Sequence, residues 1–157
     1  MRIERPLDAT PSRVYSAFAT AEGKARWFSG PQTQVLAREF DFRPGGCDRL
    51  YCQWPPRSHG RHPSARTTDL RAGYLEIVPA RRIVHAYEMF LDERKISVSL
   101  ATVEFHSHGC GTRLVITEQG AFLAGFRDEG SREHGTNWLT DQLIVSLGVT
   151  ARRVLSR

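Results

Sequence analysis

The sequence predicts an α+β fold, in which an antiparallel sheet of about six to seven strands curves around one long C-terminal helix as a helix grip. Between Gln34 and Gln119 apolar residues recur with a period of two, in short segments separated by turn residues. From Ser131 to Leu147 they recur with the 3.6-residue period of an amphipathic helix. A sheet joined by hairpins has one apolar face, and the single long helix is available to cover it.

A strand and two short helices are expected before the sheet proper. Residues 3–7 have strand character, and Thr10 followed by Pro11 is a typical start for a helix. The second short helix runs from Ala21 to Trp27 and is stopped by Gly30 and Pro31. We therefore expect two short helices inserted after the first strand.

Six further strands are expected, and alternate side chains along each strand are assigned to opposite faces of the sheet. Their ranges are Gln34 to Phe42, Cys47 to Trp54, Leu70 to Val78, Arg82 to Leu91, Ile96 to Phe105 and Thr112 to Gln119. Between the second and third of these, Pro55 to Thr67 is polar, carries three prolines and has no period, which indicates a long exposed loop. The loop holds His59 and His62 but no carboxylate or thiol to complete a metal site, so we expect no metal there.

The pattern of the long helix has an unusual centre. Its apolar side carries Trp138, Leu139, Leu143, Val145 and Leu147, and its other side carries Glu133, Asn137, Thr140 and Asp141, with Ile144 as the one apolar exception. Ser131 is a candidate N-cap, and Gly148 is a candidate stop. Small and polar residues lie in the middle of the apolar side, namely Gly135, Gln142 and Ser146. These indicate either a close backbone approach or a hollow beneath the helix.

Length and composition indicate one globular domain over residues 1–157, with 148–157 as an extension of the helix or a frayed tail. There is no run of 18 apolar residues and no secretory h-region near the N-terminus. The three cysteines, Cys47, Cys52 and Cys110, are not spaced as a disulfide framework or a zinc site. We therefore expect a cytoplasmic protein with reduced thiols, no membrane partner and no cofactor.

A net charge of +5 raises the question of nucleic acid. The basic residues are scattered, and no RNA-binding motif with interleaved aromatic residues accompanies them. A solvated basic surface explains them better than a nucleic-acid interface.

A helix-grip fold leaves room for a cavity between the sheet and the helix. Parity and the helical pattern place ten candidate ligand-binding residues there: Phe40, Phe42, His85, Tyr87, Met89, Leu114, Glu118, His134, Trp138 and Gln142. Such a mixture of apolar and a few polar groups is typical of binding pockets. The alternative is that the aromatic residues simply pack in the core and that Glu118 caps the following loop or reaches solvent.

His85, Glu118 and His134 are the inward candidates for acid–base chemistry. Glu118 and His134 flank the junction of the last strand and the helix, so we expect that they can approach each other. A carboxylate beside an imidazole raises the pKa of the histidine and orients its ring, which suits a general base. No nucleophilic triad, phosphate-binding loop or metal cluster is recognisable in the sequence.

Several segments resemble, in the same order, those of the SRPBCC (START-like) superfamily and, within it, the bacterial domains related to the activator of the heat-shock-protein-90 ATPase. The segments are Asp8–Tyr15, Ala25–Phe28 with Gly30–Pro31, Phe40–Gly46, Gly73–Pro79 with Arg82–Val84, and Gly111–Phe122. Together the matches extend from Arg2 to Leu147. The chain departs from the family at His85, where an aromatic residue is frequent, at Tyr87, where tryptophan is frequent, and after Gly135, where tryptophan is usual and this chain has Thr136.

The resemblance implies the helix-grip fold. This fold hosts several functions, so the resemblance alone does not identify one. The first hypothesis is a domain that binds a small apolar or aromatic ligand, as a monomer or a homodimer. The second is a stress-related or co-chaperone-like interaction protein with a chaperone partner. The third is an enzyme of cyclase or dehydratase type that uses Glu118 and His134.

Overall fold

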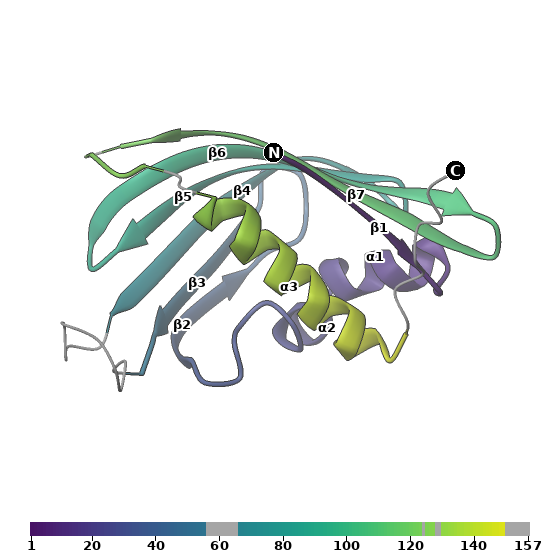
Figure 1. The fold of residues 1–157 in the computed structure, drawn as a ribbon, viewed down its shortest axis with the longest axis horizontal. Helices are drawn as coiled ribbons and strands as arrows, with labels where there is room; N and C mark the ends of the chain where they lie inside the picture. Colours follow the sequence, from purple (N-terminus) through teal and green to yellow (C-terminus); the bar gives the residue numbers. More distant parts are fainter. Residues whose placement is uncertain (56–65, 124, 128–129, 150–157) are drawn as a thin grey trace.

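The computed structural model describes residues 1–55, 66–123, 125–127 and 130–149 (Figure 1). In chain order, its elements are β1 (Arg2–Leu7), α1 (Pro11–Ala19), α2 (Ala21–Ala25), β2 (Gln34–Phe40), β3 (Cys47–Gln53), β4 (Thr67–Val78), β5 (Arg82–Leu91), β6 (Arg94–His108), β7 (Gly111–Phe122) and α3 (Ser131–Leu147). Residues 56–65, which include His59 and His62 of the expected loop, lie outside the described residues.

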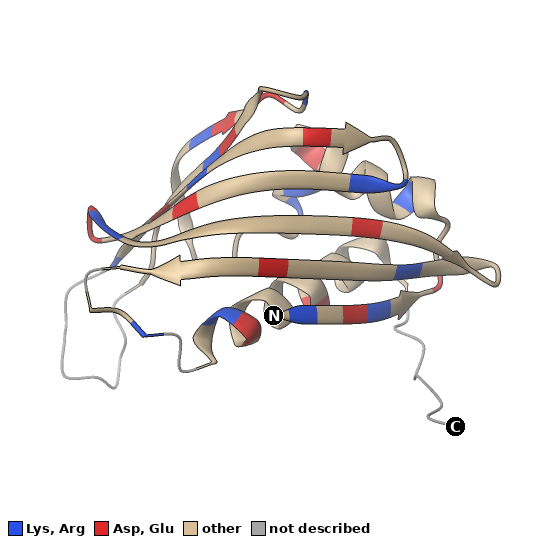
Figure 2. Ribbon diagram, turned by 90° about the horizontal axis from the view of Figure 1, so that it is seen from above, with Lys and Arg blue, Asp and Glu red and all other residues tan. Residues whose placement is uncertain are grey.

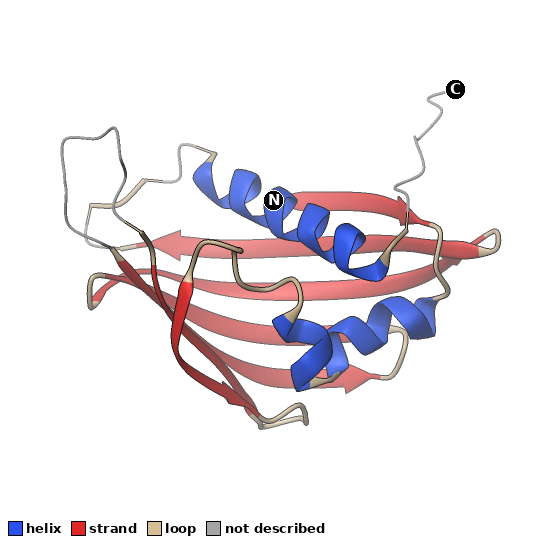
Figure 3. Ribbon diagram, turned by 90° about the horizontal axis from the view of Figure 1, so that it is seen from below, coloured by secondary structure: helices blue, strands red, loops and turns tan. Residues whose placement is uncertain are grey.

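The seven strands form one antiparallel sheet in the order β1-β7-β6-β5-β4-β3-β2. Strands β2 to β7 follow one another as hairpins, and β1 joins the far edge by pairing with β7. The sheet curves around α3, with α1 and α2 on the same face (Figures 1 and 3). The predicted α+β helix-grip fold is thereby confirmed, including the two short helices after the first strand.

Threonine side chains begin both short helices. Thr10 Oγ1 accepts from the backbone N–H of Arg13 over 3.4 Å, and Pro11 occupies the first turn, where its missing N–H costs nothing. Thr20 Oγ1 accepts from the N–H of Gly23 over 3.0 Å and thereby starts α2 directly after α1. The Thr20 cap thus begins the short helix that carries Lys24.

The long helix has the predicted bounds, but its cap and its buried face differ from the prediction. Gly130, in the left-handed region at φ 82°, precedes the helix in place of the expected Ser131 cap, whereas Gly148 ends it as predicted at φ 62°. Thr140, assigned to the outer side, is buried, and Val145, assigned to the inner side, is 74% exposed. Burial of Thr140 is tolerated because its hydroxyl donates to the carbonyl of Thr136 within the helix.

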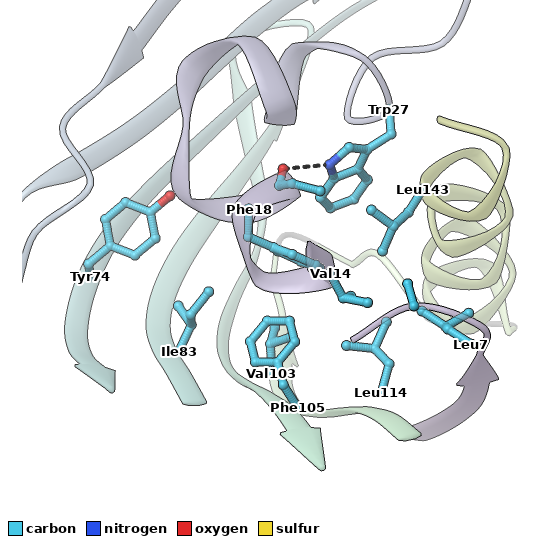
Figure 4. Close-up of a cluster of buried hydrophobic side chains, with 12 residues drawn as sticks. Leu7, Val14, Phe18, Trp27, Tyr74, Ile83, Val103, Phe105, Leu114 and Leu143 are labelled. Atoms are coloured by element: carbon cyan, nitrogen blue, oxygen red, sulfur yellow. Dashed lines mark hydrogen bonds between the residues drawn. The ribbon is translucent and has the colours of Figure 1, made fainter. Parts of the chain in front are cut away.

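The main hydrophobic core lies at one end of the interface between the helices and the sheet (Figure 4). Phe18 packs edge-to-face on Trp27 and Phe105, and the Trp27 indole N–H donates to the carbonyl of Ala17 over 2.9 Å. Leu143 of α3 and Leu114 of β7 complete this core and are both almost fully buried. Well-packed side chains therefore hold the C-terminal half of α3 against the sheet.

Acidic and basic residues are spread over the strands of the sheet (Figure 2). Several form ion pairs, such as the exposed pair of Arg82 with Glu76 and the half-buried pair of Arg113 with Glu4. Of the helices in the described segments, none combines the length and the apolar character needed to cross a membrane.

Candidate functional site

A cavity of about 400 Å³ lies between the sheet and the N-terminal half of α3. Its volume falls in the range typical of small-molecule sites. Strands β3 to β7 form one wall, and the segments after α2 and at the start of α3 form the other. Most of the lining is apolar, with aromatic and aliphatic side chains that include Trp27, Phe28, Leu70, Met89, Ile96, Ile116, Phe122, Trp138 and Leu139.

Small residues on both walls explain why this end of the interface is hollow. Ala72 and Ala101 lie on the concave face of the sheet, where larger residues would otherwise reach the helix. Gly135 lines the cavity from α3, and a Cβ atom added there would meet no atom within 4 Å. These small residues leave side-chain volume unfilled between the helix and the sheet.

Of the ten predicted ligand-binding residues, five line this cavity: His85, Tyr87, Met89, Glu118 and Trp138. That they contact a ligand remains a prediction. Parity placed the three β5 residues on one face, and the register of the sheet keeps them there, opposite Ala101, Ser99 and Ser97 of β6.

The other five lie elsewhere, so their placement in the cavity was wrong. Leu114 belongs to the packed core, and Phe42 packs against that core while its ring contacts Tyr74 edge-to-face. Phe40 stacks on Phe42 near the edge strand. His134 is exposed and Gln142 is half-buried, because the buried face of α3 is rotated away from them.

The expected pair of Glu118 and His134 does not form. Among the described residues, the cation within ion-pair distance of Glu118 is Arg132, whose Nη1 lies 3.5 Å from Glu118 Oε1. Since His134 points to the exposed side of the helix, the general base suggested from the sequence lacks its carboxylate partner.

Glu118 instead belongs to a polar cluster of Tyr87, Ser97, Glu118 and Arg132, which we name the Arg132 cluster. The Tyr87 hydroxyl donates to Glu118 Oε1 over 2.7 Å, and the Arg132 guanidinium donates to Tyr87 and to Ser97 Oγ. Burial, and next the negative charge of Glu118, raise the pKa of Tyr87, so its hydroxyl stays protonated. The buried carboxylate thus has a hydrogen-bond donor in Tyr87 and a counter-charge in Arg132.

A second polar cluster, of Lys24, Asp48 and Tyr74, lies at the α2 end of the cavity. Lys24 Nζ is in direct contact with Asp48 Oδ2, and the Tyr74 hydroxyl donates to the same oxygen over 3.1 Å. Only 8% of Lys24 and 1% of Asp48 is exposed. Burial lowers the pKa of Lys24, and the charge of Asp48 opposes that shift. The Lys24 ammonium also lies 4.4 Å from the centre of the Phe28 ring.

Lys24 and Arg132 were not predicted, although both line the cavity. Nothing in the local pattern around Lys24 indicates burial, because its partner Asp48 is 24 positions away. Arg132 could have been found, since it lies four positions before Thr136 and seven before Leu139 on the face that is buried.

His85 lines the cavity with a ring nitrogen that has no partner among the described residues. Its ring lies between Tyr74 and Tyr87, with ring centres 6.2 and 5.9 Å apart, and its enclosed Nδ1 has no hydrogen-bond partner among the described residues. Burial, and next the charge of Lys24, lower the pKa of His85 to about 4. The imidazole is therefore neutral near pH 7.

We expect His85 to make the protein less stable in mild acid. The pKa of His85 is about 4 in the folded protein and roughly 6.5 in the unfolded chain. Between these pH values the unfolded chain therefore binds more protons than the folded protein. Stability should therefore fall as pH drops through that window, by about 3 kcal/mol in total. Urea unfolding of the wild type and of His85→Phe at pH 7, 6, 5 and 4.5 measures this dependence. The free energy of unfolding should fall less steeply with decreasing pH in the variant than in the wild type. Equal pH dependence in the two proteins would refute the prediction.

Comparisons with known proteins agree with this architecture. The family model described as Activator of Hsp90 ATPase homolog 1-like protein matches residues 8–148. An uncharacterized protein from Rhizobium leguminosarum is 40% identical, with a TM-score of 0.83 over 94% of this chain and 93% of that one. A protein from Rhizobium loti is 37% identical, with a TM-score of 0.78 over 93% and 94% of the two chains.

A more distant structure, from Chromobacterium violaceum, is 24% identical with a TM-score of 0.71 over 94% and 95% of the two chains, and it bears on the fold alone. No curated protein matches this chain.

Proposed function

This chain belongs to the family of activator of Hsp90 ATPase homolog 1-like proteins, and from that premise and the cavity we propose that it binds a small, mainly apolar or aromatic molecule. The single observation that carries the proposal is the apolar cavity of about 400 Å³ with its two polar clusters. A cavity lined in this way lowers stability compared with a filled core, and a ligand that fills it recovers the lost contacts.

The polar groups of the cavity suit orientation of a ligand more than chemistry on it. Lys24 is paired with Asp48, and Arg132 is paired with Glu118, so each of these four charges already has a partner. His134 lies outside the cavity, and the cyclase or dehydratase hypothesis therefore loses one of its two residues. The co-chaperone hypothesis stays a prediction that rests on the family description.

A cavity-filling variant tests the proposal. Ala101 and Leu100 are neighbours on β6 but lie on opposite faces: Ala101 is 3% exposed and lines the cavity, whereas Leu100 is 45% exposed on the outer face. Calorimetric titration with naphthalene, indole and 2-naphthol should give saturable binding of at least one probe. Ala101→Phe should weaken it at least tenfold, roughly 1.4 kcal/mol, and Leu100→Phe should leave it unchanged.

A second variant guards against misfolding of Ala101→Phe. Gly135→Leu adds volume from the opposite wall, where the backbone leaves open space, and it replaces a poor helix former. It should therefore raise the melting temperature while also weakening the probe. The proposal is overturned if no probe binds the wild type, or if both filling variants bind as tightly as the wild type does.

A further inference from the structure

One row of residues crosses three neighbouring strands beneath the cavity. His85 of β5 pairs with Ala101 of β6, and Ala101 pairs with Glu118 of β7, so all three side chains lie on the concave face. With neighbouring strands about 4.8 Å apart, the backbones of His85 and Glu118 are separated by about 10 Å. Because Ala101 is small, the two longer side chains flank a space above it that opens into the cavity.

Each of the two flanking side chains has hydrogen-bonding capacity that the described residues do not use. Glu118 Oε1 accepts from the Tyr87 hydroxyl and lies 3.5 Å from Arg132 Nη1, and no hydrogen bond joins Oε2 to another described residue. For His85, which lines the cavity, Nδ1 is enclosed without a partner, and no hydrogen bond joins Nε2 to another described residue. Polar groups in such positions normally have partners, which here a bound molecule can provide.

The pairing of charges around the row restricts what that molecule can carry. The two polar clusters have no net charge, because the charge of Lys24 is balanced by Asp48 and that of Arg132 by Glu118. The remaining charged residue of the lining is Arg127, which is exposed, and Arg38 does not line the cavity. An anion above Ala101 would be repelled by Glu118, and an ammonium group would face Lys24 and Arg132.

We propose that the cavity selects an uncharged aromatic alcohol, of phenol or naphthol type, whose hydroxyl lies above Ala101 and joins Glu118 to His85. This inference rests on the proposed function and adds the chemical class of the ligand. The ligand hydroxyl donates to Glu118 Oε2 and accepts from the Nε2–H of His85. A hydroxyl is suited to this position because it donates and accepts at once, and a hydrogen bond to a carboxylate is stronger than one between neutral groups.

Affinities for three matched probes test the class of ligand. Naphthalene has no polar group, 2-naphthol carries the hydroxyl, and 2-naphthoate carries an anion in the same place. We expect the wild type to bind 2-naphthol about tenfold more tightly than naphthalene, and to bind 2-naphthoate most weakly. The measured quantity is the ratio of the naphthalene Kd to the 2-naphthol Kd, which a general loss of packing would not change.

Two variants test whether His85 and Glu118 cause the preference for 2-naphthol over naphthalene. His85→Phe keeps an aromatic ring beside Tyr74 and Tyr87 but removes Nε2, and Glu118→Gln replaces the carboxylate by an amide of the same shape. Each should reduce the ratio of about ten to about three or less, and Leu100→Phe should leave it at the wild-type value.

The outcomes separate this inference from the proposed function. Equal binding of naphthalene and 2-naphthol by the wild type overturns the inference and leaves an apolar binding cavity. Strongest binding of 2-naphthoate, or an unchanged ratio in both variants, overturns it as well. If none of the three probes binds, the proposed function falls and the inference falls with it.

Discussion

Replacing Asp48 by alanine will lower the free energy of unfolding by about 3–5 kcal/mol, because it leaves the Lys24 ammonium buried without its counter-charge. Burial already lowers the pKa of Lys24, and Asp48 is the group that opposes this. The variant also removes the acceptor of the Tyr74 hydroxyl, which then lies buried without that partner. Chemical denaturation of the wild type and Asp48→Ala at pH 7 measures the difference.

Two controls separate the buried charge from a general effect of substitution. The double variant Lys24→Met with Asp48→Leu should recover most of the lost stability, because an apolar pair of similar volume often replaces a buried ion pair at little cost. Glu76→Gln breaks the half-exposed pair with Arg82 and should change the midpoint far less. A loss for Asp48→Ala no larger than that for Glu76→Gln would contradict this account of the Lys24, Asp48 and Tyr74 cluster.

Replacing Arg132 by leucine will destabilise the protein by about 3 kcal/mol, although Arg132 occupies the first turn of α3. A cation at a helix N-terminus is unfavourable by about 0.3–1 kcal/mol, so loss of that repulsion alone would stabilise the variant. The opposing effect is larger, because Glu118 is only 6% exposed and Tyr87 and Ser97 lose their charged donor. Thermal unfolding distinguishes the two effects by their sign.

A second substitution identifies Glu118 as the reason. In the Arg132→Leu background, Glu118→Gln removes the negative charge that lost its partner. It should recover about half of the decrease in melting temperature caused by Arg132→Leu. The same Glu118→Gln change in the wild type should lower it, because there it leaves Arg132 without its acid. An increase in stability for Arg132→Leu alone would show that the helix dipole, and not Glu118, dominates at this position.

The strands and their faces could be predicted from the sequence because successive side chains in a strand point to opposite faces of the sheet. His85, Tyr87 and Met89 alternate with outward residues, and the flanking turns left no ambiguity about the start of the strand at Arg82. The same argument placed Leu114 and Glu118 on the inner face, but it could not say that Leu114 joins the packed core while Glu118 borders a cavity. That distinction depends on how far each strand position lies from the helix.

The face of the long helix could not be predicted in the same way. Its apolar residues are spread around the axis, so the pattern favoured Val145, which is exposed, over Thr140, which satisfies its own hydroxyl and is buried. The predicted face therefore placed His134 and Gln142 inward and did not single out Arg132. Lys24 was missed for a different reason, because its burial depends on a tertiary contact with Asp48 that no local pattern reports.

The most direct test of the binding cavity uses the methyl groups of methionine. The chain has two methionines: Met89 lines the cavity, and Met1 is outside its lining. In a protein with ¹³C-labelled methionine methyl groups, titration with 2-naphthol should shift the Met89 signal in a saturable way and leave Met1 as an internal reference. In Ala101→Phe the Met89 shift should disappear over the same concentrations. If Met89 stays unchanged in the wild type, or if both signals move together without saturation, the cavity does not bind ligands as proposed.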